Sequence, residues 1–357
     1  TNATIKATKK IAGNKELVAD AYTFELKEKD AVVATAKNTA SGEVVFNVNY
    51  TEAGEHTYTI TEKAGSEAGV TYSTESYTVK VTVADNGQGQ LVATVENADA
   101  ERVFTNTYKA ASTSATIKAK KVLNGKELVA DAYTFELKEK DAVVAEAKNT
   151  ASGEVVFNVN YTEAGEHTYT ITEKPGTEAG VTYSTESHTV KVNVVDNGQG
   201  QLVATVENAD AERVFTNTYK AASTSATIKA KKVLNGKELA ADAYTFELKE
   251  KDAVVAEAKN AASGEVVFNV NYTEAGEHTY TITEKSGTEA GVTYSTESYT
   301  VKVTVVDNGQ GQLVATVENA EADRVFTNTY KAASTSATIK AKKVLNGKEL
   351  AADAYTF

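Results

Sequence analysis

Apolar and polar residues alternate along most of this chain with a period of two. In residues 154–161, for example, Val155 and Phe157 share one face, and residues 167–173 and 188–195 alternate in the same way. Successive side chains of a β-strand point to opposite sides of the sheet, whereas a helix repeats about every 3.6 residues. The pattern therefore predicts half-buried strands.

Predicted turns separate these strands. They fall at residues 151–153, 163–165, 175–176 and 196–198, and the last has the Asp-Asn-Gly sequence that is typical of a hairpin. Residues 140–148 have the composition of a short helix, but the surrounding hairpins leave little room for one packed helix, so we predict a strand there too. Many short strands at this spacing predict an all-β fold built from β-sandwiches.

The whole pattern repeats every 111 residues, as the positions of Phe104, Phe215 and Phe326 show. A repeat of this length has the size of an ordinary domain. Residues 117–227 differ from residues 228–338 at only seven positions, and neighbours so alike must each be very stable to avoid misassembling with one another during folding. The short Lys-Ala-Ala-Ser-Thr-Ser-Ala connections, at residues 109–115 and their equivalents, predict a semi-rigid rod. The predicted domains are residues 1–109, 115–220 and 226–331, followed by the start of a fourth at 337–357.

Composition limits the classes of function. The chain has 37 Lys and Arg against 49 Asp and Glu, a net charge of −12 spread along its length, so we do not expect nucleic acid as a partner. It contains no cysteine, so disulfides and thiolate metal sites are impossible. No apolar run approaches the roughly 20 residues of a membrane span, so we expect no membrane insertion. The lack of methionine predicts a mature or excised piece of a longer protein.

Three polar side chains in each repeat are predicted on otherwise apolar strand faces. Alternation puts Lys121 on the same face as Ile117 and Leu123, and it also puts Glu173 and Asn217 on apolar faces. Burying an unpaired ammonium or carboxylate costs several kcal/mol, so we expect the three groups to contact one another. Taken singly, each has an ordinary structural explanation: a lysine whose amine reaches water, a solvated strand end and a satisfied amide.

Four sequence motifs follow one another in the same order in every complete repeat. Each complete repeat contains Tyr-Thr-Phe-Glu-Leu, then Ser-Gly-Glu-Val-Val-Phe, then Gly-Glu-His-Thr-Tyr-Thr-Ile-Thr-Glu, and finally Phe-Thr-Asn-Thr-Tyr. From end to end the repeat resembles the isopeptide-linkage domain of streptococcal, T-antigen-like backbone pilins, a relative of the B-type repeats of Gram-positive collagen adhesins. The resemblance implies an inverse immunoglobulin-like sandwich with a spontaneous amide bond between a first-strand lysine and a last-strand asparagine, assisted by a glutamate. The implied cross-links are Lys10 to Asn106, Lys121 to Asn217 and Lys232 to Asn328, with Glu62, Glu173 and Glu284 as the catalytic glutamates.

Repeat 1 leaves a choice between two lysines because it has one extra residue. Counting forward from Ile5 puts Lys9 in phase, whereas counting back from Glu16 puts Lys10 there. We predict Lys10, because the residues after it match those after Lys121 and a β-bulge two residues earlier would absorb the insertion.

The terminal fragment, residues 337–357, has a lysine in the same setting but ends before any equivalent of the glutamate or the asparagine. We expect this lysine, Lys343, to stay unlinked. We also expect residues 338–357 to be disordered or packed unnaturally.

The chemistry suits these residue types independently of the resemblance. Desolvation disfavours charge, so burial favours the neutral, nucleophilic amine of lysine and a protonated glutamic acid. That acid can hydrogen-bond the amide oxygen of the asparagine and relay a proton to the departing ammonia. Folding supplies effective molarities of roughly 10⁵ M or more, so a single turnover needs no cofactor. The link would close a loop of about 100 residues and stabilise the repeat by roughly 4–5 kcal/mol.

Other candidate sites are weaker. His56, His167 and His278 have no second His or Cys at a spacing that suits zinc, so we predict neither a metal nor a cofactor. No nucleophile and base with an oxyanion site can be recognised. We therefore predict no enzyme beyond the single-turnover, autocatalytic formation of the link.

Two classes of function remain. The first is a structural stalk or shaft segment of a Gram-positive cell-surface adhesin or pilus-like fibre, and the second is a repeated ligand-binding module for a host protein or glycan. The differences between the second and third repeats are scattered and mild, which favours the stalk. The resemblance implies an extracellular location, with anchorage to the cell wall through a region outside this segment. We expect a monomer in solution, with the neighbouring repeats as partners and any host ligand bound outside this segment.

Overall fold

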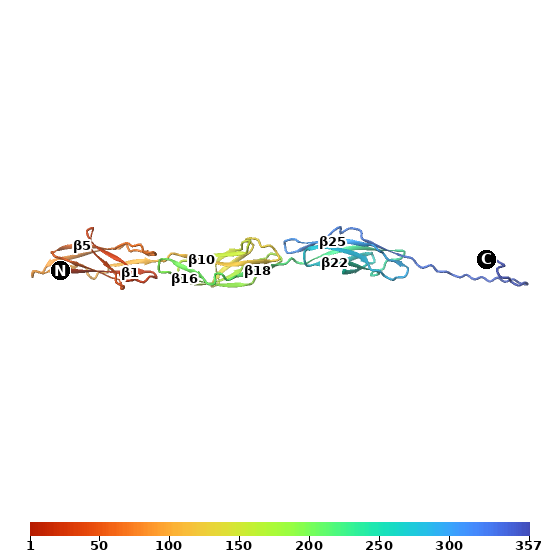
Figure 1. The fold of residues 1–357 in the computed structure, drawn as a ribbon, viewed down its shortest axis with the longest axis horizontal. Coiled ribbons are helices and arrows are strands. Elements are labelled where there is room, and N and C mark those ends of the chain that lie inside the picture. Colours follow the sequence, from red (N-terminus) through yellow and green to blue (C-terminus); the bar gives the residue numbers. More distant parts are fainter. The chain divides into compact units, whose positions relative to one another are not determined.

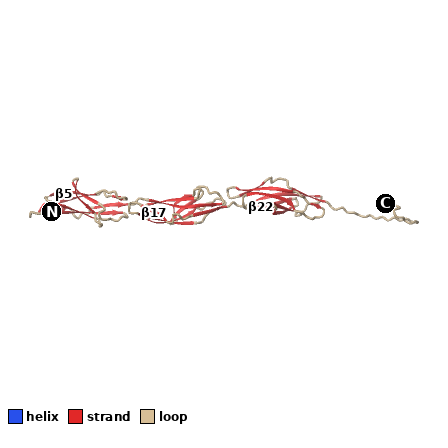
Figure 2. Cartoon of the chain, viewed as in Figure 1, coloured by secondary structure: helices blue, strands red, loops and turns tan.

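Every regular element of the protein is a β-strand. The computed structural model describes all residues from 1 to 357, and strands, turns and loops account for the whole of it (Figure 2). Contacts divide the chain into two compact units, Thr1–Gly176 with Thr182–Thr218 and Thr177–Val181 with Tyr219–Phe357. The first unit holds repeat 1 and nearly all of repeat 2, and the second holds repeat 3. No helix in residues 1–357 is long and apolar enough to cross a membrane.

Repeat 1 consists of two sheets. The four-stranded sheet has the order β4-β1-β9-β6, and the five-stranded sheet has the order β3-β2-β5-β7-β8. β1 and β5, labelled in Figure 1, thus belong to different sheets of one repeat. The strands are β1 Asn2–Ala12, β2 Thr23–Glu28, β3 Ala31–Lys37, β4 Glu43–Asn49, β5 Gly54–Glu62, β6 Val70–Thr71, β7 Ser76–Asp85, β8 Leu91–Val95 and β9 Val103–Tyr108.

Repeats 2 and 3 reproduce this topology strand for strand. The strands of repeat 2 are β10 Thr113–Asn124, β11 Thr134–Glu139, β12 Ala142–Lys148, β13 Glu154–Tyr161, β14 Gly165–Glu173, β15 Val181–Thr182, β16 Ser187–Asp196, β17 Leu202–Val206 and β18 Val214–Tyr219. The strands of repeat 3 are β19 Thr224–Asn235, β20 Thr245–Glu250, β21 Ala253–Lys259, β22 Glu265–Tyr272, β23 Gly276–Glu284, β24 Val292–Thr293, β25 Ser298–Asp307, β26 Leu313–Val317 and β27 Val325–Tyr330.

The core of each repeat lies between its two sheets. In repeat 1, the buried Phe46 and Phe104 come from the four-stranded sheet, and Phe24 and Ile60 come from the five-stranded sheet. The ring centroids of Phe24 and Phe104 are 5.2 Å apart, so the two sheets touch through their side chains. The alternation of buried and exposed positions along the strands produces this core, because only one face of each strand looks inward. The predicted all-β sandwich is confirmed.

The first and last strands of each repeat are neighbours that run in the same direction. In repeat 2, β10 pairs antiparallel with β13 on one side and parallel with β18 on the other. The register of β10 and β18 puts Leu123 opposite Asn217. Because Lys121 and Leu123 share a face of the sheet, Lys121 and Asn217 face the same side, two positions apart.

Most turns lie where the sequence predicts them. Most of residues 140–148 forms a strand, as predicted: β12 spans Ala142–Lys148, and residues 140 and 141 belong to the turn before it. The turn before β13 requires Gly153, which has φ +87°, and a Cβ there would lie 2.2 Å from the Lys121 carbonyl oxygen. The predicted hairpin at residues 196–198 is wider than a two-residue turn, because β16 and β17 are joined by residues 197–201.

The connections between repeats are shorter than predicted. After repeat 1, β10 already begins at Thr113, which pairs with Tyr161 of β13, so part of the expected joint at residues 109–115 belongs to the sheet. After Tyr330 the chain forms no further strand, and Ile339 is 95% exposed. Residues 337–357 thus have the sequence of a repeat's beginning but not its strands.

Candidate cross-linking site

A buried lysine stands in an internal strand of the four-stranded sheet in every repeat. Lys121 in β10 and Lys232 in β19 are each 1% exposed, as their position on the apolar face predicted. In repeat 1 the equivalent residue is Lys9, which is also 1% exposed, whereas Lys10 lies on the exposed face. The prediction of Lys10 as the linking lysine of repeat 1 is therefore wrong.

Lys9 is the buried lysine because repeat 1 accommodates its extra residue after β1 and not within this strand. The register between β1 and β4 is uninterrupted and pairs Thr8 with Glu43, so no β-bulge forms. Thr8 takes the position that Lys120 has in β10, so Lys9 takes the position of Lys121 and points into the core. The extra residue lies instead in the exposed turn after β1, at Gly13 and Asn14, where an insertion disturbs no strand pairing.

A buried glutamate connects the lysine to the asparagine. In repeat 2, Lys121 Nζ donates to Glu173 Oε2 at 2.8 Å, and Asn217 Nδ2 donates to Glu173 Oε1 at 2.6 Å. The side chains of the lysine and glutamate have no exposed surface, and Asn217 is completely buried. Glu173 ends β14 in the five-stranded sheet, so the contact crosses the core. The structure thus brings together the three residues that the sequence singled out in this repeat.

Repeats 1 and 3 contain the same cluster. The lysine-to-glutamate distances are 2.8 and 2.7 Å, and the asparagine-to-glutamate distances are both 2.7 Å. The members are Lys9, Glu62 and Asn106 in repeat 1 and Lys232, Glu284 and Asn328 in repeat 3. Each of these residues was predicted from the sequence except Lys9, in whose place Lys10 was predicted.

A main-chain group orients the asparagine side chain. Ser184 N donates to Asn217 Oδ1 at 2.7 Å, and a serine N–H makes the same contact at 2.7 Å in both other repeats. An N–H group can only meet an acceptor, so the amide oxygen faces the serine and the amide nitrogen faces the glutamate. The expectation that the glutamate binds the amide oxygen is thereby corrected.

A tyrosine ring covers the lysine amine. In repeat 2, Lys121 Nζ lies 4.6 Å from the centroid of the Tyr133 ring, and the distance is the same in the other two repeats. Burial and the charge of a nearby glutamate raise the pKa of Tyr244, the equivalent residue of repeat 3, to about 12. The ring is therefore neutral near physiological pH, and its face can stabilise an ammonium while it keeps water away.

Burial opposes the positive charge of the lysine. Desolvation lowers the pKa of Lys9, Lys121 and Lys232, while the hydrogen bond and ion pair with the glutamate oppose this shift. A deprotonated lysine amine is a nucleophile, and the carboxylate that can take its proton lies 2.8 Å away in repeat 2. The cluster thus holds a nucleophile, a proton carrier and a carboxamide that can be attacked.

The serine and the tyrosine were not predicted from the sequence. The serine acts through its main-chain N–H, which almost every residue has, so no side-chain pattern could have indicated it. Tyr133 could have been predicted from the alternation of strand faces, because it stands two residues before the buried Phe135. Tyr133 is itself 3% exposed. The signal was present in the Tyr-Thr-Phe-Glu-Leu motif but was not used.

The histidines contact side chains of neighbouring strands. In repeat 2, His167 Nδ1 lies 2.9 Å from Glu139 Oε1, and the His167 ring packs against Tyr161 with centroids 4.8 Å apart. No group of three or more His, Cys, Asp or Glu residues in residues 1–357 is arranged to hold a metal ion.

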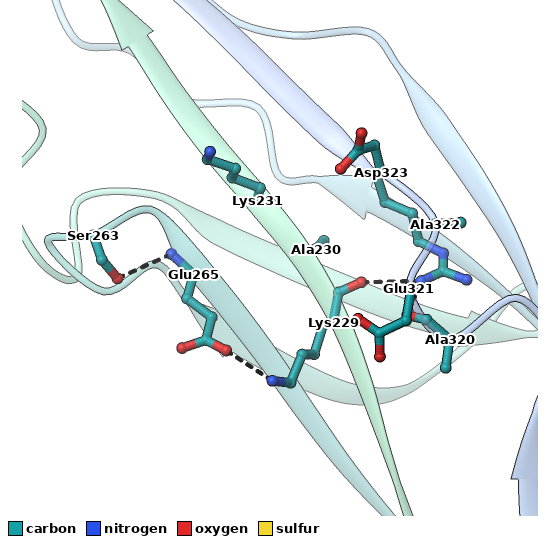
Figure 3. Close-up of a pocket in the computed structure, with 10 residues that line it drawn as sticks. Lys229, Ala230, Lys231, Ser263, Glu265, Ala320, Glu321, Ala322 and Asp323 are labelled. Atoms are coloured by element: carbon teal, nitrogen blue, oxygen red, sulfur yellow. Dashed lines mark hydrogen bonds and ion pairs between the residues drawn. The ribbon is translucent and has the colours of Figure 1, made fainter.

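A surface pocket of about 220 Å³ lies on repeat 3, and Figure 3 shows the residues that line it. Lys229 Nζ pairs with Glu265 at 3.2 Å, and the Lys229 carbonyl oxygen accepts a bond from Arg324 at 3.4 Å. Several of its charged groups are therefore paired within the protein, and none of the lining residues belongs to the cluster.

A sequence model of one protein family matches all three repeats. The match covers residues 5–109, 117–220 and 228–331, and the family is FctA, the Spy0128-like isopeptide containing domain. The chain belongs to this family. FctA domains are structural repeats of pilins and adhesins and are not enzymes. The resemblance found in the sequence is thereby confirmed.

Comparison with solved structures finds similar proteins at low identity. Two B repeat units of the collagen binding protein of Staphylococcus aureus are 17% identical, with 92% of this chain and 76% of that chain covered and a TM-score of 0.25. The major pilin of Streptococcus pyogenes is 17% identical, with 61% and 98% covered and a TM-score of 0.23. The Bacillus anthracis TIE protein is 14% identical, with 84% and 48% covered and a TM-score of 0.20, so this FctA chain spans about half of its length. No curated protein sequence matches the chain.

Proposed function

We propose that each FctA repeat of this protein closes itself with an amide bond between its buried lysine and asparagine. The observation that carries the proposal is the glutamate that contacts both groups: Glu173 lies 2.8 Å from Lys121 Nζ and 2.6 Å from Asn217 Nδ2. The three bonds would join Lys9 to Asn106, Lys121 to Asn217 and Lys232 to Asn328.

The proposed reaction begins with proton transfer from Lys121 Nζ to Glu173 Oε2. The neutral amine attacks Cγ of Asn217, so the Nζ–Cγ bond forms while the electrons of the carbonyl bond move to Oδ1. Glu173 carries protons from Nζ to Nδ2, the Cγ–Nδ2 bond breaks, and ammonia leaves. Of the two protons that Nζ gives up, one departs in the ammonia and the other stays on Glu173, which becomes neutral.

The surroundings of the asparagine support the addition step. Negative charge develops on Oδ1 during the attack, and Ser184 N–H already donates to that oxygen at 2.7 Å. A preorganised donor of this kind lowers the energy of the tetrahedral intermediate, as an oxyanion hole does. The product is a neutral amide, so two buried charges disappear, and the loss of ammonia makes reversal improbable.

The position of the bond would make each repeat resistant to extension. β10 and β18 are parallel neighbours, so tension on the two ends of the repeat passes along β10 to Lys121, through the amide bond, and out along β18 from Asn217. The residues between these two positions hold most of the core and lie outside that path. The bond also closes a loop of about 100 residues, which stabilises the repeat by roughly 4–5 kcal/mol and requires no cysteine.

We infer that the protein serves as a shaft segment of a Gram-positive surface adhesin or pilus-like fibre. Three self-linked repeats in tandem would hold a binding tip away from the cell and bear load. The location would be extracellular, with the attachment to the cell wall in a region outside this segment.

Peptide mapping tests the bond at the level of residues. Repeat 1 is the best place, because the sequence Lys-Lys-Ile-Ala-Gly around Lys9 and Lys10 occurs once in the chain. Digestion of the wild-type chain should release a branched peptide in which Lys9 is joined to Asn106 and Lys10 is unmodified. The Asn106→Ala variant should give two linear peptides instead. Recovery of Lys9 and Asn106 in separate, unmodified peptides from the wild type would refute the proposal.

A further inference from the structure

One loop carries several of the groups that surround the linking site of repeat 1. It begins directly after Glu62 and ends at Ser73, whose N–H donates to Asn106 Oδ1 at 2.7 Å. Residues 63–68 are all exposed, and the loop contains two glycines, so little within it restricts its motion. We term residues 63–73 the cover loop of repeat 1.

Two tyrosines connect the middle of the cover loop to the reacting groups. The Tyr22 hydroxyl donates to Glu67 Oε2 at 3.2 Å, and Glu67 N donates to the Tyr72 hydroxyl at 3.4 Å. The two rings pack edge to face with centroids 5.9 Å apart. The Tyr22 ring lies 4.6 Å from Lys9 Nζ, and Tyr72 directly precedes Ser73. A displacement of Glu67 is therefore transmitted both to the ring that covers the amine and to the N–H that holds the asparagine.

A turn of repeat 2 packs on the middle of this cover loop. The turn comprises residues 196–202, which lead from the end of β16 to the start of β17, and we term it the joint turn of repeat 2. A Cβ on Gly200 would lie 2.6 Å from the carbonyl carbon of Ala68 and 2.8 Å from Gly69 N, so the two main chains are in direct contact. Ala68 is the residue next to Glu67. All of these residues lie within the first compact unit.

Hydrogen bonds fix the joint turn against repeat 1. The Tyr108 hydroxyl donates to Asp196 Oδ1 at 2.8 Å and accepts a bond from Gly200 N at 3.1 Å. In the connecting segment, Ala111 N donates to Gly200 O at 2.8 Å, and Leu202 N donates to Ala111 O at 3.0 Å. Tyr108 is consequently only 4% exposed. The joint turn is thus held in place and limits the movement of the cover loop that it touches.

The joint turn lies far from the linking site of its own repeat. It follows the end of β16 that pairs with the beginning of β14, where Val194 lies opposite Gly165. Glu173 stands at the other end of β14. The joint turn of repeat 2 is therefore remote from its own glutamate, although it contacts the cover loop of the repeat before it.

We propose that the joint turn of one repeat positions the cover loop of the preceding repeat for the linking reaction. The inference rests on the proposed amide bond and adds a role for the neighbouring repeat. A held cover loop keeps the Ser73 N–H on Asn106 Oδ1, where negative charge develops, and keeps the Tyr22 ring over the amine. Groups held in the reactive arrangement accelerate a reaction, and small displacements slow it steeply. A repeat consequently links faster once the next repeat has folded against it.

A chain in which only repeat 1 can link tests the proposal. The full 357-residue chain with Asn217→Ala and Asn328→Ala is recovered unfolded from inclusion bodies, and folding is started by dilution. Intact mass then follows the loss of one ammonia from repeat 1, while circular dichroism shows when folding is complete. Adding Gly200→Ala should slow this loss by about 10–10²-fold, because the new methyl group forces the joint turn away from the cover loop.

Gly198→Ala is the matched control in the same chain. Both glycines lie in the joint turn at positive φ, +71° for Gly198 and +82° for Gly200, so alanine carries a similar backbone cost at each. A Cβ on Gly198 would meet nothing within 4 Å, so this variant should link at the rate of the chain without a glycine substitution. Equal rates for the two glycine variants would overturn the proposal. Full mass in every chain, including the wild type, would instead overturn the amide bond itself and this inference with it.

A second chain tests whether the effect crosses from one repeat to the next. With Asn106→Ala and Asn328→Ala, only repeat 2 can link. The turn that touches its loop belongs to repeat 3, where a Cβ on Gly311 would lie 2.6 Å from the carbonyl carbon of Ala179. In this chain Gly311→Ala should slow linking by about 10–10²-fold, whereas Gly200→Ala should leave the rate unchanged. An equal loss of rate in both variants would indicate damage within repeat 2 and would overturn the proposal.

Discussion

The first strands of repeats 1 and 2 reach the same site from different sequences. In repeat 2 the buried lysine follows another lysine, whereas in repeat 1 Lys9 follows Thr8 and precedes a second lysine. Both buried lysines nevertheless lie 2.8 Å from their glutamate. A strand that pairs with neighbours on both sides keeps its register, and the extra residue moves into the following turn. Equivalent residues are therefore better assigned by counting from the paired part of the strand than from the turn.

Replacing either lysine of repeat 1 tests this assignment and should have the largest effect. Lys9→Ala removes the proposed link and leaves a buried glutamate without its partner, so repeat 1 should lose at least about 4–5 kcal/mol of unfolding free energy. Lys10→Ala changes an exposed side chain and should stay within about 0.5 kcal/mol of the wild type. Calorimetry measures the unfolding free energy of both variants. Equal losses would contradict the assignment of Lys9 as the linking lysine.

Replacing the glutamate of repeat 2 tests the proton carrier. Glu173→Gln keeps the shape of the side chain but cannot take the lysine proton, so linking in repeat 2 should slow by about 10²–10⁴-fold. Time-resolved mass spectrometry after refolding measures this rate. The control is Glu166→Gln, an exposed position on the same strand, which should link at the wild-type rate. An unchanged rate of linking in Glu173→Gln would show that the glutamate does not carry the proton.

The pH dependence of stability should distinguish a free lysine from a linked one. Burial lowers the pKa of Lys121 in the folded repeat below its value of 10.5 in the unfolded chain. Between these two pKa values the unfolded state binds more protons, so the stability of an unlinked repeat rises with pH in this window, by at most about 1.4 kcal/mol per pH unit. Asn217→Ala should show this rise in denaturant unfolding curves. The wild-type repeat 2 should not show it, because an amide nitrogen does not titrate there.

His188 offers the smallest test, because repeats 1 and 3 have tyrosine at this position. His188 Nε2 lies 3.1 Å from the Val214 carbonyl oxygen, and Tyr299 makes the equivalent bond to the Val325 oxygen at 2.9 Å. His188→Tyr should therefore change the stability of repeat 2 by no more than about 1 kcal/mol. Tyr299→His in repeat 3 is the matched control, and calorimetry should find it equally mild.

The fold and the chemical groups of the site could be predicted because both rest on local alternation. The positions of Lys121, Glu173 and Asn217 on inward faces follow from counting along single strands. The serine N–H could not be predicted, because a main-chain donor has no sequence signature. Counting from Ile5 indicated Lys9 and counting back from Glu16 indicated Lys10, and the choice between them depends on the uninterrupted pairing of β1 with its neighbours, which the sequence does not show.

The contact between Tyr108 and Asp196 could not be predicted by counting along single strands. The two residues are 88 positions apart and belong to different repeats. Each has an ordinary local setting at the end of a strand, Tyr108 in β9 and Asp196 in β16, so no pattern within a repeat connects them.

The intact mass of the full chain tests the central claim most directly. Each completed link releases one ammonia, so the account predicts a mass lower than that of the sequence by three ammonia molecules, one for each complete repeat. The segment ends before any equivalent of Glu173 or Asn217 that could react with Lys343, so this lysine should contribute no fourth loss. Finding the unreduced mass of the sequence in the folded protein would contradict the account.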